Sequence, residues 1–282
     1  MTVYTLALSC CDQPGLVASV GGVVFRCGGN ILDAQQFNDR ETGLFFVRLV
    51  FETDLARDHL EPAIAAMGQV NGMDRRLRPS TERQRVILMV SKFDHCLIDL
   101  LYRYRIGELQ MQVAGVISNH PLETLRVSLP NGVPFHYLPV TKETKAEQEA
   151  QIKAIVTETA ADLVVLARYM QILSGDLSAF LSGRCINIHH SFLPGFKGAR
   201  PYHQAFARGV KMIGATAHYV TADLDEGPII HQDVEAVTHA NSPNDLLRKG
   251  RNIEQRVLAR AVLHHLQDRV LMNGRKTVVF GD

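Results

Sequence analysis

The first 80 residues alternate between the apolar spacing of strands and that of helices. Leu16, Val20 and Val23 recur at helical spacing, whereas Phe45 and Val47 lie on one face of an alternating run. The expected elements are a strand at 3–9, a helix at 16–27, a strand from 31, a strand at 44–51, a helix at 56–67 and a strand at 73–77. The pattern therefore predicts a small βαββαβ domain over residues 1–80.

From residue 85 onward, apolar strand-length runs alternate with helical patterns. The expected strands are 86–90, 112–118, 163–167 and 185–188, with helices at 94–105, 122–129, 144–159 and 243–267, and a C-terminal hairpin at 270–280. This alternation is typical of an open, mostly parallel, Rossmann-like α/β sheet covered on both faces. We expect it to fill a second domain over residues 86–282.

The segment between these two patterns is polar and rich in arginine. Residues 74–85 read DRRLRPSTERQR, and the domain boundary is expected as a linker at 81–85. A solvated linker fits this composition better than a nucleic-acid patch, since no aromatic residues interleave the arginines.

Composition narrows the functional class. The chain has 282 residues and a formal net charge of +1, which gives no electrostatic reason to expect nucleic acid or a membrane surface. No apolar run approaches the roughly 20 residues of a transmembrane helix, and no signal peptide is expected. Five cysteines without CxxC spacing argue against a disulfide framework or a zinc site. A cytoplasmic location is predicted.

The densest group of polar residues lies between 185 and 233. Strand alternation would place Asn187 and His189 on one face, with isoleucines on the other. The pair alone also fits a satisfied polar pair in a core. A second apolar run, 213–220, ends in an acidic loop that returns to the same edge if the sheet is continuous.

That loop supplies a carboxylate to the same edge. Asp223, Asp225 and Glu226 compete for the role, and spacing does not choose between them. An amide, an imidazole and a carboxylate together form a plausible acyl-transfer set, namely an oxyanion donor, an acid or base, and its orienting partner.

Several blocks of this stretch resemble a known family. NIHHSFLPGFKG and HYVTADLDEGPII resemble the signatures of the folate-dependent formyl transferase and hydrolase superfamily. The longer blocks HHSFLP, GARPYHQA and GATAHYV look most like its hydrolytic branch, the formyltetrahydrofolate deformylases. The resemblance covers residues 85–282, and the N-terminal segment is similar to that branch too. It implies a formyltransferase fold for the second domain.

The resemblance implies a catalytic set of Asn187, His189 and Asp225. Asn187 and a protonated His189 would donate hydrogen bonds to the oxyanion, and Asp225 would orient His189 and pass on a proton. Metal binding is not expected, because the nearby histidines lack matched ligand spacing. No cofactor is implied beyond the folate, which is the substrate.

A second segment resembles the folate-binding part of the superfamily. There, backbone groups bond the pterin and apolar side chains pack on it, with the 220–225 backbone as the opposite wall. The predicted folate-binding residues are Arg168, Tyr169, Met170, Gln171, Ile172, Leu173, Val220, Thr221 and Leu224.

The loop after the first strand of the second domain separates transfer from hydrolysis. Glycinamide ribonucleotide formyltransferases carry a glycine-rich phosphate loop there, whereas residues 91–98 read SKFDHCLI. Phosphate binding needs backbone amides that can approach the anion, and Asp94 opposes an anion that Lys92 would attract. Water is then the expected acceptor. His190, where the transferases more often have proline, is expected on the strand face opposite His189.

The N-terminal domain resembles an ACT domain, a module that pairs with another copy and binds a small amino acid. The candidate effector site comprises Asp12, Gln13, Gly15 and Leu16, at the start of the first helix. A purely structural oligomerisation domain is the alternative. Either interpretation predicts a homo-oligomer.

The predicted function is hydrolysis of 10-formyltetrahydrofolate to tetrahydrofolate and formate, which would balance one-carbon pools and supply formate for purine synthesis. Two alternatives are a formyltransferase with an amine acceptor and a non-catalytic amino-acid sensor that binds folate. Release of formate without an acceptor separates hydrolysis from both.

Overall fold

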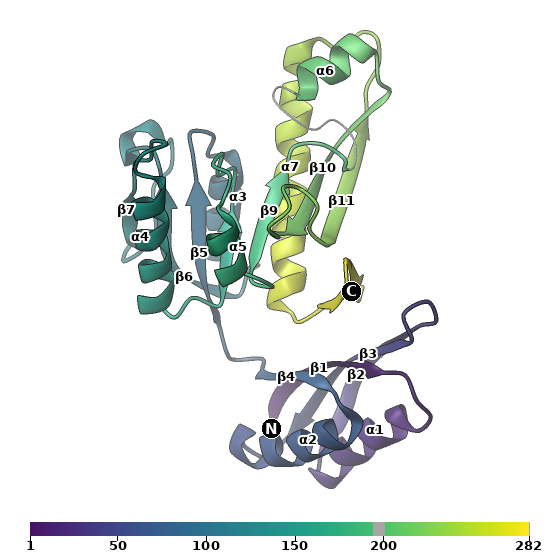
Figure 1. Cartoon of the computed structure of the whole chain (residues 1–282). Helices are drawn as coiled ribbons and strands as arrows, with labels where there is room; N and C mark the ends of the chain where they lie inside the picture. The colour runs from purple at the N-terminus through teal and green to yellow at the C-terminus, as the bar shows by residue number, and fades with distance from the viewer. Residues whose placement is uncertain (194–200, 282) are drawn as a thin grey trace. The chain divides into compact units, whose positions relative to one another are not determined.

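The computed structural model describes residues 1–193 and 201–281, which form two compact units (Figure 1). The first unit is Met1–Arg83 together with Gln267–Asp282, and the second is Gln84–Leu266. The C-terminal hairpin therefore belongs with the N-terminal unit, and the expected second domain of 86–282 is too long at its end. Residues 194–200 of the GFKG-containing block lie outside the described residues.

The first unit has the predicted βαββαβ order. Its elements are β1 (Thr2–Cys11), α1 (Leu16–Arg26), β2 (Asn30–Asp39), β3 (Leu44–Thr53), α2 (Arg57–Asn71) and β4 (Asp74–Pro79). The sheet order is β2-β3-β1-β4, and the neighbouring strands are antiparallel. Gly28 ends α1 with a positive φ of 61°, a conformation that glycine adopts without steric cost.

Alternation along β3 sends its side chains into two separate cores. Phe45, Val47 and Leu49 are buried on the face covered by α1 and α2. Phe46 points the other way and packs with Leu271 and other residues of the C-terminal hairpin. This hairpin, β12 (Val270–Asn273) and β13 (Lys276–Val279), covers the sheet face that the helices leave open.

The arginine-rich segment begins as strand β4, which confirms the strand predicted at 73–77 and leaves only residues 80–83 between β4 and β5 for the expected linker. Leu77 is buried in the core, while the arginines beside it point outward. Arg76 and Arg78 both pair with Asp268, at 3.0 and 3.3 Å. Because that buried carboxylate lies nearly 200 residues away in the sequence, local composition could not reveal what neutralises the arginines.

The second unit contains a mixed seven-stranded sheet among the described residues. Its order is β11-β10-β9-β8-β5-β6-β7, with pairs from β9 to β7 parallel and β10 antiparallel to both neighbours. The strands are β5 (Gln84–Val90), β6 (Met111–Ser118), β7 (Phe135–Tyr137), β8 (Leu163–Leu166), β9 (Cys185–His189), β10 (Met212–Tyr219) and β11 (Ile229–Ala236). The predicted mostly parallel α/β sheet is confirmed.

The helices of this unit differ from expectation in three places. α3 (His95–Arg105), α4 (Lys145–Glu158) and α7 (Pro243–Leu266) lie where the pattern places them. The expected helix at 122–129 is wrong, since only the 3₁₀ turn η1 (Leu122–Thr124) forms there. Two short helices, α5 (Gly175–Phe180) and α6 (Pro201–Arg208), were not predicted.

The 24-residue helix α7 packs along the sheet of the second unit (Figure 1). Leu246, Ile253, Val257 and Ala261 are buried on its predicted apolar side. Glu254 is buried with them, which the apolar spacing did not anticipate. No described helix combines the length and apolar character that crossing a bilayer requires.

The Asp268 ion pairs generate a stability prediction for the first unit. Asp268→Asn keeps a residue that tolerates the left-handed backbone observed there (φ 53°) but removes the charge. The free energy of unfolding should fall by about 1.5–3 kcal/mol, because Arg78 is left buried without its partner. Chemical denaturation measures the change. Glu41→Gln, which breaks the exposed pair with Lys276, should leave stability nearly unchanged, and an equal loss in both variants would contradict the assignment.

Candidate active site

The carboxyl ends of β8 and β9 open into a cavity of about 750 Å³ in the second unit. Ligands of open α/β sheets gather at this edge. The cavity is lined by Asn187, His189 and Asp225, so the three predicted catalytic residues share one space.

Strand pairing brings Asn187 to a histidine that sequence spacing did not single out. β9 and β10 run antiparallel, and their register sets Asn187 opposite His218. The Asn187 Nδ2 and His218 Nε2 atoms are 3.3 Å apart. His218 Nδ1 lies 2.8 Å from the Tyr219 carbonyl, which can only accept, so Nδ1 donates. Nε2 is therefore the ring nitrogen that meets the Asn187 amide, whose second N–H remains available to a ligand.

The acidic loop after β10 returns to the same edge through a tight backbone turn. Asp225 adopts a left-handed conformation with φ 57°, which is uncommon for a residue with a side chain. Two residues later the chain passes so close to β10 that a Cβ at Gly227 would lie 1.7 Å from the Tyr219 carbonyl oxygen. Only glycine fits there, which explains the Asp-Glu-Gly order of the loop.

The Asp225 carboxylate lies beside two imidazoles. Its Oδ1 is 3.2 Å from His189 Nδ1 and 3.7 Å from His218 Nε2. Burial alone would raise the pKa of this carboxyl, but its interactions with His189 and His218 outweigh burial and hold the pKa well below its usual range. Asp225 is therefore ionised at neutral pH and fixes the orientation of the His189 ring.

The other nitrogen of His189, Nε2, is left open toward a ligand. Nε2 is buried and has no hydrogen-bond partner among the described residues. A buried polar atom without a partner calls for an explanation, because leaving it unpaired costs free energy. A substrate oxygen or nitrogen in the cavity supplies one.

Two polar side chains that the sequence did not indicate hold the turn after β9. The Thr216 hydroxyl donates to the Ser191 carbonyl and accepts from the Leu193 amide, both at 3.0 Å. Gln232 donates to the same hydroxyl and to the Leu193 carbonyl. Because these contacts join β10 and β11 to the turn, only the strand pairing could have revealed them.

Comparison with known proteins places this geometry in a family. A formyl transferase family model matches residues 84–262. A formyltetrahydrofolate deformylase from Synechocystis sp. is 48% identical over 279 residues, which cover 98% of this chain and 98% of that protein. A formyltetrahydrofolate deformylase from Corynebacterium sp. is 46% identical over 279 residues, which cover 98% of this chain and 97% of that protein. The chain belongs to the formyltetrahydrofolate deformylase family.

Solved structures support this family assignment and distinguish the deformylases from the related transformylases. The crystal structure of the Burkholderia mallei deformylase matches with a TM-score of 0.93 and 48% identity, covering 100% of both chains. A glycinamide ribonucleotide transformylase from Symbiobacterium toebii matches with a TM-score of 0.65 and 31% identity, over 73% of this chain and 98% of its own. The deformylase match therefore covers the whole chain, whereas the transformylase match leaves about a quarter of it uncovered.

All nine residues predicted from the deformylase resemblance to bind folate line the cavity: Arg168, Tyr169, Met170, Gln171, Ile172, Leu173, Val220, Thr221 and Leu224. Met170, Ile172 and Leu224 keep more than half of their surface exposed, as walls for a flat apolar ligand would. Tyr169 differs, because its ring is buried in the core and its hydroxyl accepts a hydrogen bond from Gln148 at 2.9 Å.

Ser91 fixes the backbone of this segment. Its hydroxyl accepts from the Met170 amide at 2.9 Å, and its own amide donates to the Arg168 carbonyl. Arg168 has a positive φ of 67°, a second strained backbone position in the cavity wall.

His190 does not point away from His189 as strand alternation predicted. β9 ends at His189, and the two rings stack with centroids 5.1 Å apart. Burial, followed by the nearby positive charge of Arg168, lowers the pKa of His190 to about 4. His190 is therefore a neutral side chain of the cavity at physiological pH.

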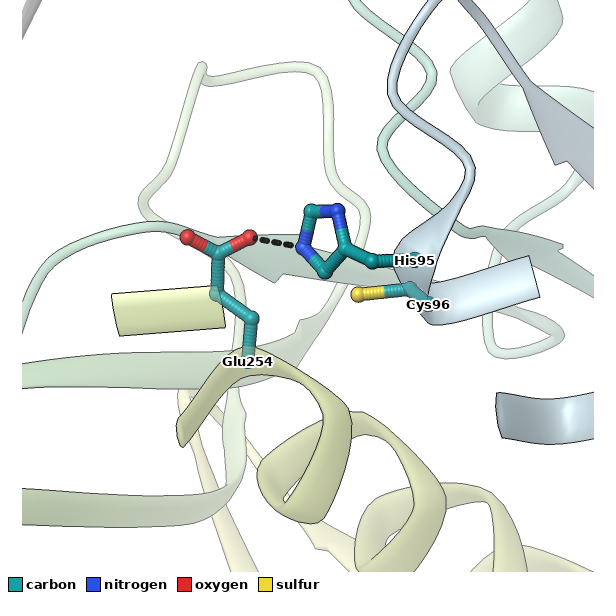
Figure 2. Close-up of side chains that lie close together, drawn as sticks. All are labelled: His95, Cys96 and Glu254. Atoms are coloured by element: carbon teal, nitrogen blue, oxygen red, sulfur yellow. Dashed lines mark hydrogen bonds and ion pairs between the residues drawn. The ribbon is translucent and has the colours of Figure 1, made fainter. Parts of the chain in front are cut away.

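A second polar cluster forms another wall of the cavity. Figure 2 shows Glu254 reaching from α7 toward the start of α3, where its Oε2 lies 2.8 Å from His95 Nε2. Tyr202 donates to Oε1 at 2.7 Å. Burial opposes ionisation of Glu254, but the hydrogen bond from His95 and the charge of Arg168 outweigh it and lower its pKa.

This cluster contains the three side chains that come closest to a metal-ligand set among the described residues: His95, Cys96 and Glu254. Arg168 Nε lies 3.4 Å from Glu254 Oε2, so a cation bound there would face a fixed positive charge. Burial also raises the pKa of Cys96, which disfavours the thiolate that metals bind. The donor set therefore fits an ion-paired network better than a metal site.

The candidate effector residues lie in the first unit, where α1 begins. Gly15 caps α1 in the left-handed conformation, and Gln13 donates to Asn71 at 3.1 Å. The Leu16 side chain is buried in the core, so it offers a ligand only its backbone. Asp12 and Gln13 are exposed.

His190 generates a prediction on pH. Its folded pKa is depressed, so between about pH 6.5 and pH 4 the unfolded chain binds a proton that the folded chain refuses, and stability falls as pH falls. His190→Gln should make the loss of unfolding free energy from pH 7 to pH 5 smaller by roughly 1–2 kcal/mol. Chemical denaturation at both pH values measures this. An unchanged loss would show that His190 titrates normally.

Proposed function

We propose that this chain hydrolyses 10-formyltetrahydrofolate to tetrahydrofolate and formate. The observation that carries the proposal is the contact between His189 and an ionised Asp225 in the cavity that also contains Asn187 and the predicted folate segment. These groups supply what attack on a formyl carbonyl requires, namely oxyanion donors and a proton relay.

In the proposed mechanism, water attacks the formyl carbon, and the carbonyl electrons move onto oxygen. The Asn187 amide and His189 Nε2 donate to this oxyanion, because both line the cavity and Nε2 lacks a partner among the described residues. The carbon–N10 bond then breaks as N10 takes from Asp225 the proton that came from water, and the formic acid product loses its proton to become formate. The mechanism uses no metal or cofactor.

Asp225 holds the catalytic histidine in one tautomer. With Oδ1 at 3.2 Å, Nδ1 of His189 donates to the carboxylate, so the ring keeps one orientation toward the substrate. The carboxylate also accepts the proton of the attacking water, directly or through a second water.

The loop after β5 favours water as the acceptor. It leads directly into α3, whose N-cap is Asp94, and the Asp94 carboxylate accepts the Arg126 amide at 2.5 Å. A phosphate-binding loop needs free backbone amides at this position, and the Asp94 carboxylate would instead repel a phosphate. A nucleotide acceptor therefore finds no anion site in this loop.

Asp225→Asn tests the mechanism. Formate release from 10-formyltetrahydrofolate alone should fall by roughly a hundredfold or more, because the amide neither ionises nor accepts the proton, while folate affinity changes little. Turnover is measured without any amine acceptor, and folate binding by fluorescence titration. Asp223→Asn on the same loop is the control and should keep most activity. Full activity of Asp225→Asn would remove this residue from the mechanism.

We further propose that this activity balances one-carbon pools and supplies formate for purine synthesis in the cytoplasm. Five free cysteines, four of them buried, are consistent with a reducing compartment.

We also propose that the first unit is an ACT-like module that assembles the chain into a homo-oligomer and binds an amino acid near Asp12, Gln13 and Gly15. Its βαββαβ order supports this assignment. β2 is a ten-residue edge strand that exposes Leu32 and Phe37, and an unprotected edge of this kind invites pairing with another chain. The amides at the start of α1 suit a carboxylate.

Introducing charges on the edge strand β2 tests the proposed assembly. The double variant Leu32→Lys and Phe37→Lys should shift the protein to a smaller species in light scattering, because lysines on an edge strand oppose strand pairing. Val70→Lys, at another exposed apolar position on α2, should keep the wild-type mass. If the mass is unchanged in the double variant, the oligomer interface lies elsewhere.

A further inference from the structure

The Arg168 side chain presents an unsatisfied buried cation to the cavity. Only 10% of the side chain is exposed, and neither Nε nor Nη1 makes a hydrogen bond with the described residues. Nε lies 3.4 Å from Glu254 Oε2, close enough for an ion pair but not aligned as a hydrogen bond. Buried guanidinium N–H groups are normally paired, so this side chain is built to receive a further acceptor.

The surrounding residues hold Arg168 in place without satisfying it. Glu254 is itself fixed by His95 at 2.8 Å (Figure 2) and by Tyr202 at 2.7 Å, so it serves as a rigid counter-ion. Gly250, one turn earlier on α7, leaves room for the Tyr202 ring, since a Cβ there would lie 2.1 Å from Tyr202 Cζ. The strained φ of 67° at Arg168 is thus maintained by the packing around it.

The guanidinium lies near the reacting groups. Arg168 lines the same cavity as Asn187 and His189, and its charge reaches His190, whose pKa it helps to lower. The His190 ring stacks on His189. The neutral His190 therefore contacts the catalytic histidine and also lies within reach of the charge of Arg168.

We propose that Arg168 forms a subsite for the carboxylate product. Its guanidinium binds the formate ion as that ion leaves the catalytic residues. This inference rests on the proposed hydrolysis. That reaction turns a neutral formyl group into an anion beside the ionised Asp225, and like charges repel the product from its place of formation. Of the two described arginines in the cavity wall, Arg251 is exposed and Arg168 is the desolvated one that formate can pair with.

The negative charge of Glu254 restricts the ligand of this subsite to a monoanion. Glu254 leaves the cluster with little excess positive charge, so a dianion such as phosphate is repelled more strongly than formate. Unpaired guanidinium N–H groups match the oxygens of a small carboxylate.

Product inhibition tests the subsite. Tetrahydrofolate formation is followed with added sodium formate, at ionic strength held constant with sodium chloride. Formate should inhibit the wild type, and Arg168→Gln should raise its inhibition constant about tenfold or more, because a charge-assisted hydrogen bond is lost. Glu254→Gln should lower the constant, since the counter-charge is gone. Arg251→Gln, the matched control, should stay within about twofold of wild type.

A second measurement does not depend on turnover. The line width of [13C]formate in the NMR spectrum should increase with wild-type protein and with Arg251→Gln, and much less with Arg168→Gln or Arg168→Lys. The proposal is overturned if formate neither inhibits nor binds the wild type, or if Arg168→Gln keeps the wild-type inhibition constant. It is also overturned if Asn187→Ala alone weakens formate binding, or if chloride inhibits equally. Failure of the proposed hydrolysis itself appears separately, as absent tetrahydrofolate formation before any formate is added.

Discussion

The ion pair between Asp225 and His189 is the interaction on which the rest of the site depends. It joins a loop after β10 to the end of β9 at 3.2 Å, and it keeps a half-buried carboxylate ionised. The loop can reach β9 because Gly227 lets the chain pass against the Tyr219 carbonyl. Once the carboxylate is fixed, the orientation of the His189 ring follows, and its Nε2 lies in the cavity lining as a buried atom that has no hydrogen-bond partner among the described residues.

Strand pairing supplies the second part of the arrangement. The antiparallel partner of β9 places His218 opposite Asn187, and His218 in turn is fixed by a backbone carbonyl. Because each catalytic side chain has a neighbour that sets its orientation, little reorganisation is needed when charge develops on the substrate. The Glu254 cluster repeats this principle on another wall, where a fixed carboxylate positions Arg168.

Spacing and motif resemblance predicted much of this site, and the remainder depends on contacts between distant segments. The alternation of Asn187 and His189 on a strand was visible in the sequence, as was the edge at which loops meet. The roles of His218 and Thr216 were not, because they follow from the register of β10 against β9. Glu254 lies on an otherwise apolar side of α7, and its burial makes sense only with partners from three other segments. The arginines of β4 are a similar case, since Asp268 neutralises them from far along the chain.

The central claim is that water, and not an amine, receives the formyl group. Turnover of 10-formyltetrahydrofolate in H₂¹⁸O, followed by mass spectrometry of the formate, tests it most directly. One ¹⁸O atom per formate, with an equal amount of tetrahydrofolate, is the predicted result, because the attacking oxygen comes from solvent. Absence of formate, or formate without the label, would contradict hydrolysis at this site.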